Sequence, residues 1–227
     1  MKSVVIISGG MDSITLLHDL VKQYGKKNIE AISFLYGSRH MGKEIPMAKA
    51  NCKKLGVKHQ VIDVRQAFKD FKSSLLNKKD SEKIPEGHYK AKTMKSTVVP
   101  FRNGILLSIA AGYADSVGAK VIFYGAHSGD HAIYPDCRIS FVKRISEAIQ
   151  LGTYGRIGIK APYEKISKIE ILKKGIKLGV DYSKTWTCYN PTKGKACGKC
   201  GACQERLEAF RRNNIEDPLK YVATKGV

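Results

Sequence analysis

Long hydrophobic runs are missing from this sequence of 227 residues. No stretch approaches the roughly 20 consecutive apolar residues that a membrane-spanning helix needs, although the hydrophobic fraction of 43% is ordinary. The apolar run at the start is short and ends in Gly-Gly-Met-Asp, whereas a secretory signal needs a longer apolar region and a small-residue cleavage site. Internal repeats and low-complexity tracts are also absent from the sequence. We therefore expect a cytoplasmic protein without a membrane segment.

Acidic side chains are scarce. Only 20 stand against 40 lysines and arginines, which leaves a formal net charge of +20. Such a surplus attracts anions of every kind, including nucleotides, nucleic acid and acidic substrates, and does not choose among them. The lysines are scattered along the chain, which is also typical of a solvated surface. The charge therefore permits nucleic-acid binding without requiring it.

Strand and helix patterns alternate along most of the chain. Short runs rich in β-branched and aromatic residues predict buried parallel strands, at Val4–Ile7, Ile29–Tyr36, His59–Val64 and Val121–Tyr124, with a fifth candidate at Arg156–Lys160. Segments with helical spacing lie between them, among them Ser13–Tyr24, Met41–Leu55, Gly104–Val117 and Ser167–Leu178. This alternation predicts right-handed crossovers and an α/β fold with a doubly wound parallel sheet of about five strands.

A polar, basic segment from Phe68 to Val98 breaks this pattern. We expect a long loop or flexible lid there, because structureless stretches of this length in compact domains tend to be functional or disordered. A mobile insertion without a role is the alternative. After Tyr182 the composition changes to cysteine, glycine and lysine. Residues 1–182 are therefore expected to form an α/β domain, and residues 183–227 a small C-terminal module.

The first strand runs directly into the turn Ser8-Gly9-Gly10-Met11-Asp12-Ser13, and a helix opens immediately afterwards. Open α/β sheets bind ligands at such strand ends. Two glycines let the backbone approach a phosphate, the helix N-terminus adds positive potential, and both serines can donate hydrogen bonds. The turn lacks the Lys-Ser/Thr ending of the Walker motif, so it predicts a pyrophosphate cradle. A plain Gly-Gly turn with helix caps is the alternative.

Four of the six cysteines gather near the C-terminus, at Cys188, Cys197, Cys200 and Cys203. Two overlapping C-x2-C turns bring three thiolates to one point, and Cys188 can complete a tetrahedral site. In a cytosolic protein such clustering favours a metal over disulfides. Four thiolates leave no position for water, so we predict a structural Zn²⁺, with an iron–sulfur cluster as the rival. The metal is expected to pin a tail helix at Gln204–Arg212 against the sheet.

Three further stretches fall at strand ends on the same rim as the Ser8–Ser13 turn. They are Tyr36–His40, Val99–Asn103 and Gly125–Arg138. The carboxyl ends of parallel strands meet at one edge of a sheet, where a site assembled from several loops should lie. We therefore expect all three stretches to contribute to one binding site.

The Ser8–Ser13 turn resembles the SGGxDS signature of the PP-loop pyrophosphatases, which adenylate a carboxyl or equivalent group and release pyrophosphate. Together with the three rim stretches, Thr185–Tyr189 and the four cysteines, it is similar to the motif set of the 7-cyano-7-deazaguanine synthase family, in the family's order and over nearly the whole chain. That resemblance implies a homodimer that uses ATP and Mg²⁺ to convert 7-carboxy-7-deazaguanine and ammonia into the nitrile, a precursor of queuosine and archaeosine. The carboxylate is adenylated and aminated, and the resulting amide is adenylated again and dehydrated.

The resemblance also assigns roles in cofactor binding and catalysis. Asp12 holds Mg²⁺ or orients phosphates, and the pyrophosphate lies on Ser8, Gly9, Gly10, Met11 and Ser13. The site must neutralise several negative charges, for which guanidinium groups are suited. We expect the catalytic set to be Asp12, Arg102, Arg138 and Lys168. Each of these cations, taken alone, is also compatible with an ordinary surface position.

Substrate contacts are expected from Arg39, His40, Arg102, Asn103, His127, Tyr134, Asp136, Arg138 and Trp186. Asp136 would accept hydrogen bonds from the guanine-like N–H groups, and Tyr134 or Trp186 would stack on the ring. The alternatives are Asp136 as a turn cap before a helix at Ser140–Leu151, and Trp186 as packing on the zinc module. The two histidines are candidate proton shuttles for ammonia, although lone histidines are more often structural.

Three positions depart from the family pattern, which has Gln at Ser38, a small residue at Phe101 and Gly at Ile133. Phe101 is the largest change in volume and bears on substrate identity. Two other functions remain open at this stage: a PP-loop enzyme that modifies tRNA, and a nucleic-acid-binding zinc-ribbon protein with an inactive PP-loop. The first would need an RNA-binding domain or a catalytic cysteine pair, neither of which is evident, and the intact Ser8–Ser13 turn disfavours the second.

Overall fold

The computed structural model of the chain describes residues 1–76, 83–87, 92–129 and 133–222. Five parallel strands in these ranges form one sheet, in the order β3-β2-β1-β4-β5. The strands are β1 (Ser3–Ile6), β2 (Ile29–Leu35), β3 (Lys58–Asp63), β4 (Val121–Phe123) and β5 (Gly158–Lys160). The chain winds outward from β1 through β2 and β3, then returns to the other side of β1 with β4. The predicted doubly wound α/β sheet is therefore confirmed.

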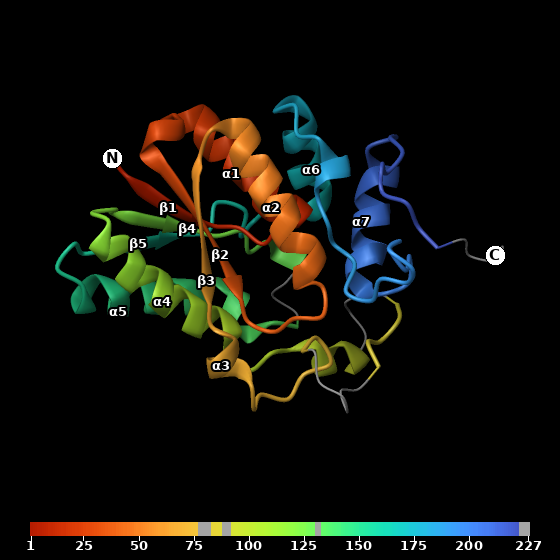
Figure 1. The fold of residues 1–227 in the computed structure, drawn as a ribbon, viewed down its shortest axis with the longest axis horizontal. Helices are drawn as coiled ribbons and strands as arrows, with labels where there is room; N and C mark the ends of the chain where they lie inside the picture. The colour runs from red at the N-terminus through yellow and green to blue at the C-terminus, as the bar shows by residue number, and fades with distance from the viewer. Residues whose placement is uncertain (77–82, 88–91, 130–132, 223–227) are drawn as a thin grey trace.

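Helices cover both faces of the sheet (Figure 1). One face carries α1 (Met11–Tyr24) and α2 (Met41–Leu55), and the other carries α4 (Arg102–Ser116) and α5 (Ile139–Gly152). At one end, α6 (Lys168–Lys177) packs between α1 and α7 (Gly201–Arg212). The remaining elements are short: α3 (Arg65–Phe68) and turns of 3-10 helix at Lys26–Asn28, Lys92–Thr97, Pro135–Cys137 and Tyr182–Lys184. Among the described residues, no helix is long and apolar enough to span a bilayer.

The apolar runs of β1, β2 and β4 become strands because both of their faces are buried. The prediction of a buried strand at His59–Val64 is wrong in its burial, because β3 lies at the edge of the sheet and its residues are exposed or half-buried. Successive side chains of a strand point to opposite faces. Val4 of β1 therefore belongs to the core under α4, which contains Leu107, whereas its neighbour Val5 belongs to the core under α1, which contains Leu17. A strand covered on both faces needs apolar residues at every position, which explains the continuous hydrophobic runs in the sequence.

Helix α6 begins where its sequence predicts. Ser167 accepts a hydrogen bond from the backbone N–H of Glu170, and the Glu170 carboxylate accepts one from the backbone N–H of Ser167. This reciprocal capping box satisfies two N–H groups that the helix itself leaves unpaired. It also fixes Lys168 as the first residue of the helix.

The described parts of the segment from Phe68 to Val98 differ from the expected free lid. Leu75, Leu76 and Met94 are buried in the core, and the backbone N–H of Gly87 donates to the carbonyl of Lys199. The apolar residues are spaced irregularly along the segment, so no periodic pattern announces them. The segment is a loop that is fastened to the core at these points; residues 77–82 and 88–91 lie outside the described residues.

A buried arginine ties α7 to the chain segments on either side of it. Arg206 of α7 is fully buried, and its guanidinium pairs with the carboxylate of Asp217 and donates to the Thr185 hydroxyl and the Tyr182 carbonyl. These partners accept hydrogen bonds from each nitrogen of the guanidinium, which offsets the cost of burying its charge. Ala209 and Phe210 of α7 belong to the core cluster that α1 and α6 also form, so this helix packs on the α/β core.

Phe101 explains why a small residue is expected before α4. Its backbone φ is +49°, in the left-handed region, and the residue is 60% exposed. A residue with a Cβ atom pays about 1–2 kcal/mol for this conformation. Part of that strain is offset by packing, because the ring covers Gly104 and meets Phe141 edge-on, with ring centroids 5.8 Å apart.

We predict that Phe101→Gly is more stable than Phe101→Ala by about 1 kcal/mol. Both variants lose the ring and its contacts, but only glycine relieves the left-handed backbone. Urea unfolding followed by circular dichroism measures the difference. Equal stability of the two variants would show that the backbone at this position is unstrained.

Candidate active site

The turn between β1 and α1 is a compact loop held by its own side chains. The Ser13 hydroxyl accepts from the backbone N–H of Ser8 at 3.2 Å and donates to the Gly10 carbonyl at 3.1 Å. The N–H of Gly10 donates to the Ser8 hydroxyl at 3.1 Å. No side chain caps the N-terminus of α1, so the N–H groups of its first turn can bind an anion.

Two other elements press on this turn. A Cβ atom on Gly9, whose φ is +97°, would lie 2.1 Å from the backbone carbonyl oxygen of Glu44 in α2. On the other side, the backbone N–H of Trp186 donates to the Gly9 carbonyl at 2.9 Å. The turn is thus clamped between α2 and the C-terminal segment, and only glycine fits at position 9.

A cavity of about 220 Å³ opens beside the turn, at the carboxyl ends of β1, β2 and β4. It gathers most of the predicted site residues from distant parts of the chain. Those lining it are Ser8, Gly10, Met11, Asp12, Ser13, His40, Arg102, Asn103, His127, Lys168 and Trp186.

Asp12 lies at the centre of a charged cluster. One of its carboxylate oxygens, Oδ2, is 3.4 Å from Lys168 Nζ and 3.9 Å from His127 Nε2. Lys168 in turn contacts Glu205 of α7 at 2.8 Å. His127 Nδ1 accepts the N–H of Gly129 at 3.1 Å, so in the neutral ring Nε2 carries the proton and faces Asp12. The other Asp12 oxygen, Oδ1, is buried and has no partner among the described residues.

A second polar cluster in the cavity lining consists of His40 and Glu44, at the start of α2. His40 Nε2 is 3.3 Å from Glu44 Oε2, and the His40 ring packs against Tyr189 at 4.9 Å. Burial, and then the charge of Arg102, lower the pKa of His40 to about 3. Burial raises the pKa of Glu44 to about 8, although the Arg102 charge and a hydrogen bond from Ser8 act in the opposite direction.

Two further polar atoms of this cluster are buried without a partner in the described part of the chain. They are Nδ1 of His40 and the hydroxyl oxygen of Ser38. Leaving such atoms unpaired costs about 1–3 kcal/mol each. Because both residues line the cavity, these atoms are suited to bind a polar ligand there.

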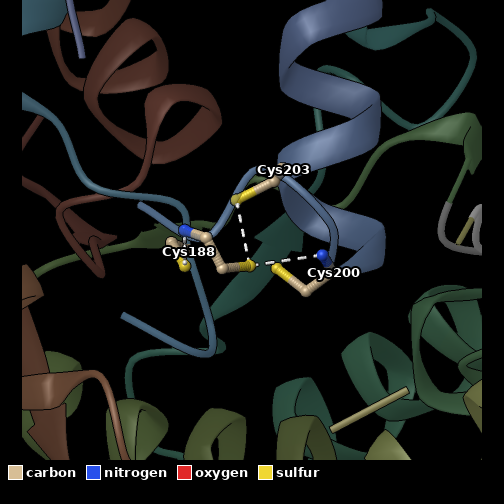
Figure 2. A group of neighbouring side chains, drawn as sticks. Cys188, Cys200 and Cys203 are labelled. Carbon is tan, nitrogen blue, oxygen red and sulfur yellow. Dashed lines mark hydrogen bonds between the residues drawn. The ribbon is translucent and has the colours of Figure 1, made fainter. Parts of the chain in front are cut away.

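The four cysteines converge on one point, as Figure 2 shows for Cys188, Cys200 and Cys203. All four sulfur atoms lie within 4.8 Å of one another, and those of Cys197 and Cys203 are 3.9 Å apart. Zn–S bonds of about 2.3 Å at tetrahedral angles place sulfurs about 3.8 Å apart. Backbone N–H groups of Cys197, Lys199 and Cys200 point at the sulfurs of the cluster, at 3.2 to 3.4 Å. The geometry fits a single tetrahedral metal ion.

Comparison with known families agrees with this arrangement. The family model described as queuosine biosynthesis protein QueC matches residues 2–214. The chain belongs to the QueC family. It is 54% identical to 7-cyano-7-deazaguanine synthase 1 of Colwellia psychrerythraea, over 97% of this chain and 98% of that protein. It is 52% identical to the 7-cyano-7-deazaguanine synthase of Hahella chejuensis, over 97% of this chain and 93% of the relative.

Three of the residues assigned from the QueC family pattern do not line the cavity. Arg39 Nε donates to the Leu76 carbonyl at 3.4 Å, and the Tyr134 hydroxyl shares a 3.1 Å hydrogen bond with Thr97. Arg138 is exposed just before α5. These side chains are not among those that line the cavity.

Asp136 acts as a helix cap in this structure, although not of the expected helix. Its Oδ2 accepts the backbone N–H of Asn103 at 2.8 Å, in the first turn of α4 rather than of the helix that follows it in sequence. The Asn103 amide then donates to the Cys137 sulfur at 3.1 Å. Asp136 thus fixes the start of α4, from which Arg102 and Asn103 reach the cavity.

Trp186 lines the cavity and also packs on the cysteine module. Its indole N–H donates to the Cys188 carbonyl at 2.9 Å, and the Lys43 ammonium lies 5.6 Å from its ring centroid. The packing alternative and the binding role are therefore compatible, since the same side chain serves both surfaces.

Sequence reasoning missed two acidic residues of the site, Glu44 and Glu205. Glu44 stands four residues after His40, so the two share one face of α2, and this spacing is a signal that was available in the sequence. Glu205 reaches Lys168 only because α7 packs on α6. No local pattern links these two residues.

We predict that Gly9→Ala destroys ligand binding and destabilises the protein by several kcal/mol, because its Cβ would overlap the α2 backbone. The matched control is Gly42→Ala in α2, where no atom lies within 4 Å of the added Cβ. Alanine there should raise stability by about 0.5–1 kcal/mol. Thermal unfolding with and without ATP compares the two. A Gly9→Ala protein that still gains stability from ATP would contradict the clamp.

Proposed function

We propose that the protein is a 7-cyano-7-deazaguanine synthase, which uses ATP to convert 7-carboxy-7-deazaguanine and ammonia into the nitrile 7-cyano-7-deazaguanine. The observation that carries this proposal is the 54% identity to a synthase of that name over 97% of the chain. The cavity supports it, because a pyrophosphate turn, two cations and unpaired polar atoms line the same space.

The charges around the turn suit adenylation of a carboxylate. The triphosphate would lie on the Ser8–Ser13 turn, with Lys168 and Arg102 as the cations that neutralise it. Asp12 would hold Mg²⁺ through its unpaired Oδ1, and that ion would supply charge neutralisation to the leaving pyrophosphate. Arg102 carries the second role of orienting the substrate carboxylate, since it enters the cavity from α4 beside Asn103.

We propose further that the four cysteines hold a structural Zn²⁺. All four sulfurs surround one point, which leaves no open coordination position for a reacting molecule. Each iron of a four-iron cluster sits at its own corner with its own thiolate, so that cluster would need sulfurs spread more widely than the 4.8 Å found here. We propose in addition that the protein is a homodimer, which rests on the family resemblance. We place it in the cytoplasm, because its six cysteines form no disulfide and thiols of this kind suit a reducing compartment.

The decisive assay is mass spectrometry of products from purified protein, ATP, Mg²⁺, ammonium and 7-carboxy-7-deazaguanine. We expect the nitrile from the wild type and a loss of at least about 100-fold in Asp12→Asn, since that change removes the carboxylate charge from the turn. Exposed Asp70 provides the matched control, and Asp70→Asn should retain full activity. If ATP is consumed only with another carboxylate or with tRNA, and no nitrile forms, the protein acts on a different substrate.

We predict that Cys200→Ser loses its metal and lowers the melting temperature, because a structural zinc site contributes directly to folding. Metal analysis of the wild type should give about one zinc per chain. Cys52→Ser is the control, since Cys52 lies in α2 outside the cluster, and it should keep the zinc. Iron in place of zinc in anaerobically purified wild type would support the cluster alternative.

A further inference from the structure

The lining of the cavity contains only two acidic side chains among the described residues, Asp12 and Glu44. Asp12 is engaged with Lys168 and with the phosphate-binding turn. Glu44 is different, because it faces the turn from α2 and its carboxyl group lies 3.3 Å from Nε2 of the neutral His40 ring. The roles derived above leave this buried carboxyl group without a function.

The carboxyl group of Glu44 and the ring of His40 are in contact. With Nε2 of His40 protonated, its N–H points at the Glu44 carboxylate 3.3 Å away. The lone pair is then on Nδ1, which is buried and has no partner in the described part of the chain. Burial and the charge of Arg102 lower the pKa of His40 to about 3, so this ring stays neutral and is a weak base. Burial raises the pKa of Glu44 to about 8, so its carboxylate is the stronger base of the two groups and the one suited to take a proton.

The chemistry of the proposed function requires such an acceptor. Ammonia carries hydrogen atoms that the nitrile no longer has. The first proton leaves when nitrogen attacks the acyl adenylate, the C–N bond forms and the C–O bond to AMP breaks. The amide oxygen then attacks the α-phosphorus of a second ATP and releases pyrophosphate. The two remaining N–H protons must leave as the C–O bond to this AMP breaks and the carbon–nitrogen triple bond forms.

We propose that the Glu44 carboxylate is the general base of this dehydration and takes a nitrogen-bound proton, while the neutral His40 ring, 3.3 Å away, holds that carboxylate in place. This inference rests on the proposed function. It separates the two acids of the cavity by role: Asp12 serves the phosphates, and Glu44 serves the nitrogen.

The surroundings of Glu44 set the pH range in which the pair works. Arg102 of α4 lies near it, Ser8 of the turn donates to it, and Tyr189 of the C-terminal segment packs on the partner His40. Burial raises the pKa of Glu44 to about 8, so the carboxylate form that accepts protons gains population as pH rises through this value. The rate of dehydration should therefore increase with pH up to about 8.

The test is Glu44→Gln, which keeps the shape of the side chain and removes its charge. Glu147→Gln, at an exposed ion pair with Arg144 on α5, is the matched control. Both are compared with the wild type in carboxylate-dependent exchange of pyrophosphate into ATP, which reports the first adenylation, and in nitrile formation from the amide and ATP, which reports dehydration.

We expect Glu44→Gln to keep pyrophosphate exchange within about threefold of the wild type, because adenylation moves no nitrogen-bound proton. Nitrile formation from the amide should fall by about 100-fold or more, the range typical of a lost general base, and the rise of rate toward pH 8 should disappear. Glu147→Gln should match the wild type in both assays.

Two outcomes would overturn the inference. Nitrile formation by Glu44→Gln at the wild-type rate and with the wild-type pH profile would show that another group takes the protons. An equal loss of pyrophosphate exchange and dehydration would show that Glu44 supports the turn rather than the nitrogen chemistry. Failure of the wild type itself to make nitrile would instead reject the proposed function, so the two failures are distinguishable.

Discussion

The close approach of α2 to the first turn of the sheet is the contact on which the rest of the site depends. The Glu44 carbonyl occupies the space that a Cβ atom at position 9 would need. The phosphate-binding turn therefore packs against α2 only with glycine at this position. That contact fixes two things at once. It sets the position of the turn, and because the carbonyl belongs to Glu44 it also places the side chain of this residue in the lining of the cavity.

The C-terminal segment completes the site from the opposite side. Its anchor is Arg206, whose buried guanidinium ties α7 to the loop that runs from Tyr182 to Thr187. The same segment delivers Trp186 to the turn and Glu205 to Lys168. A metal in the cysteine cluster would hold the start of α7 and the end of that loop together, so its effect on the active site would be through position rather than through chemistry.

Much of the fold follows from local patterns, and the parts that do not have physical reasons. The inner strands β1, β2 and β4 are predictable because both of their faces are buried, and the Ser8–Ser13 turn is predictable because a glycine turn before a helix suits phosphate. Leu75 and Met94 were hidden because isolated apolar residues in a basic loop carry no period. The capping alternative for Asp136 named the helix that follows it in sequence, whereas its partner Asn103 lies in α4, 33 residues away, and capping across such a distance leaves no local signal.

Positive charge at the cavity bears on the protonation of Glu44. In a chain of net charge +20, a buried carboxyl group near Arg102 would be expected to ionise easily. Burial nevertheless outweighs the cation and keeps the pKa of Glu44 raised. Arriving phosphates would add negative charge and raise it further, whereas departing pyrophosphate would lower it. In the proposed function the affinity of Glu44 for a proton would therefore be coupled to the presence of the nucleotide, and such coupling suits a reaction that alternates between adenylate transfer and proton removal.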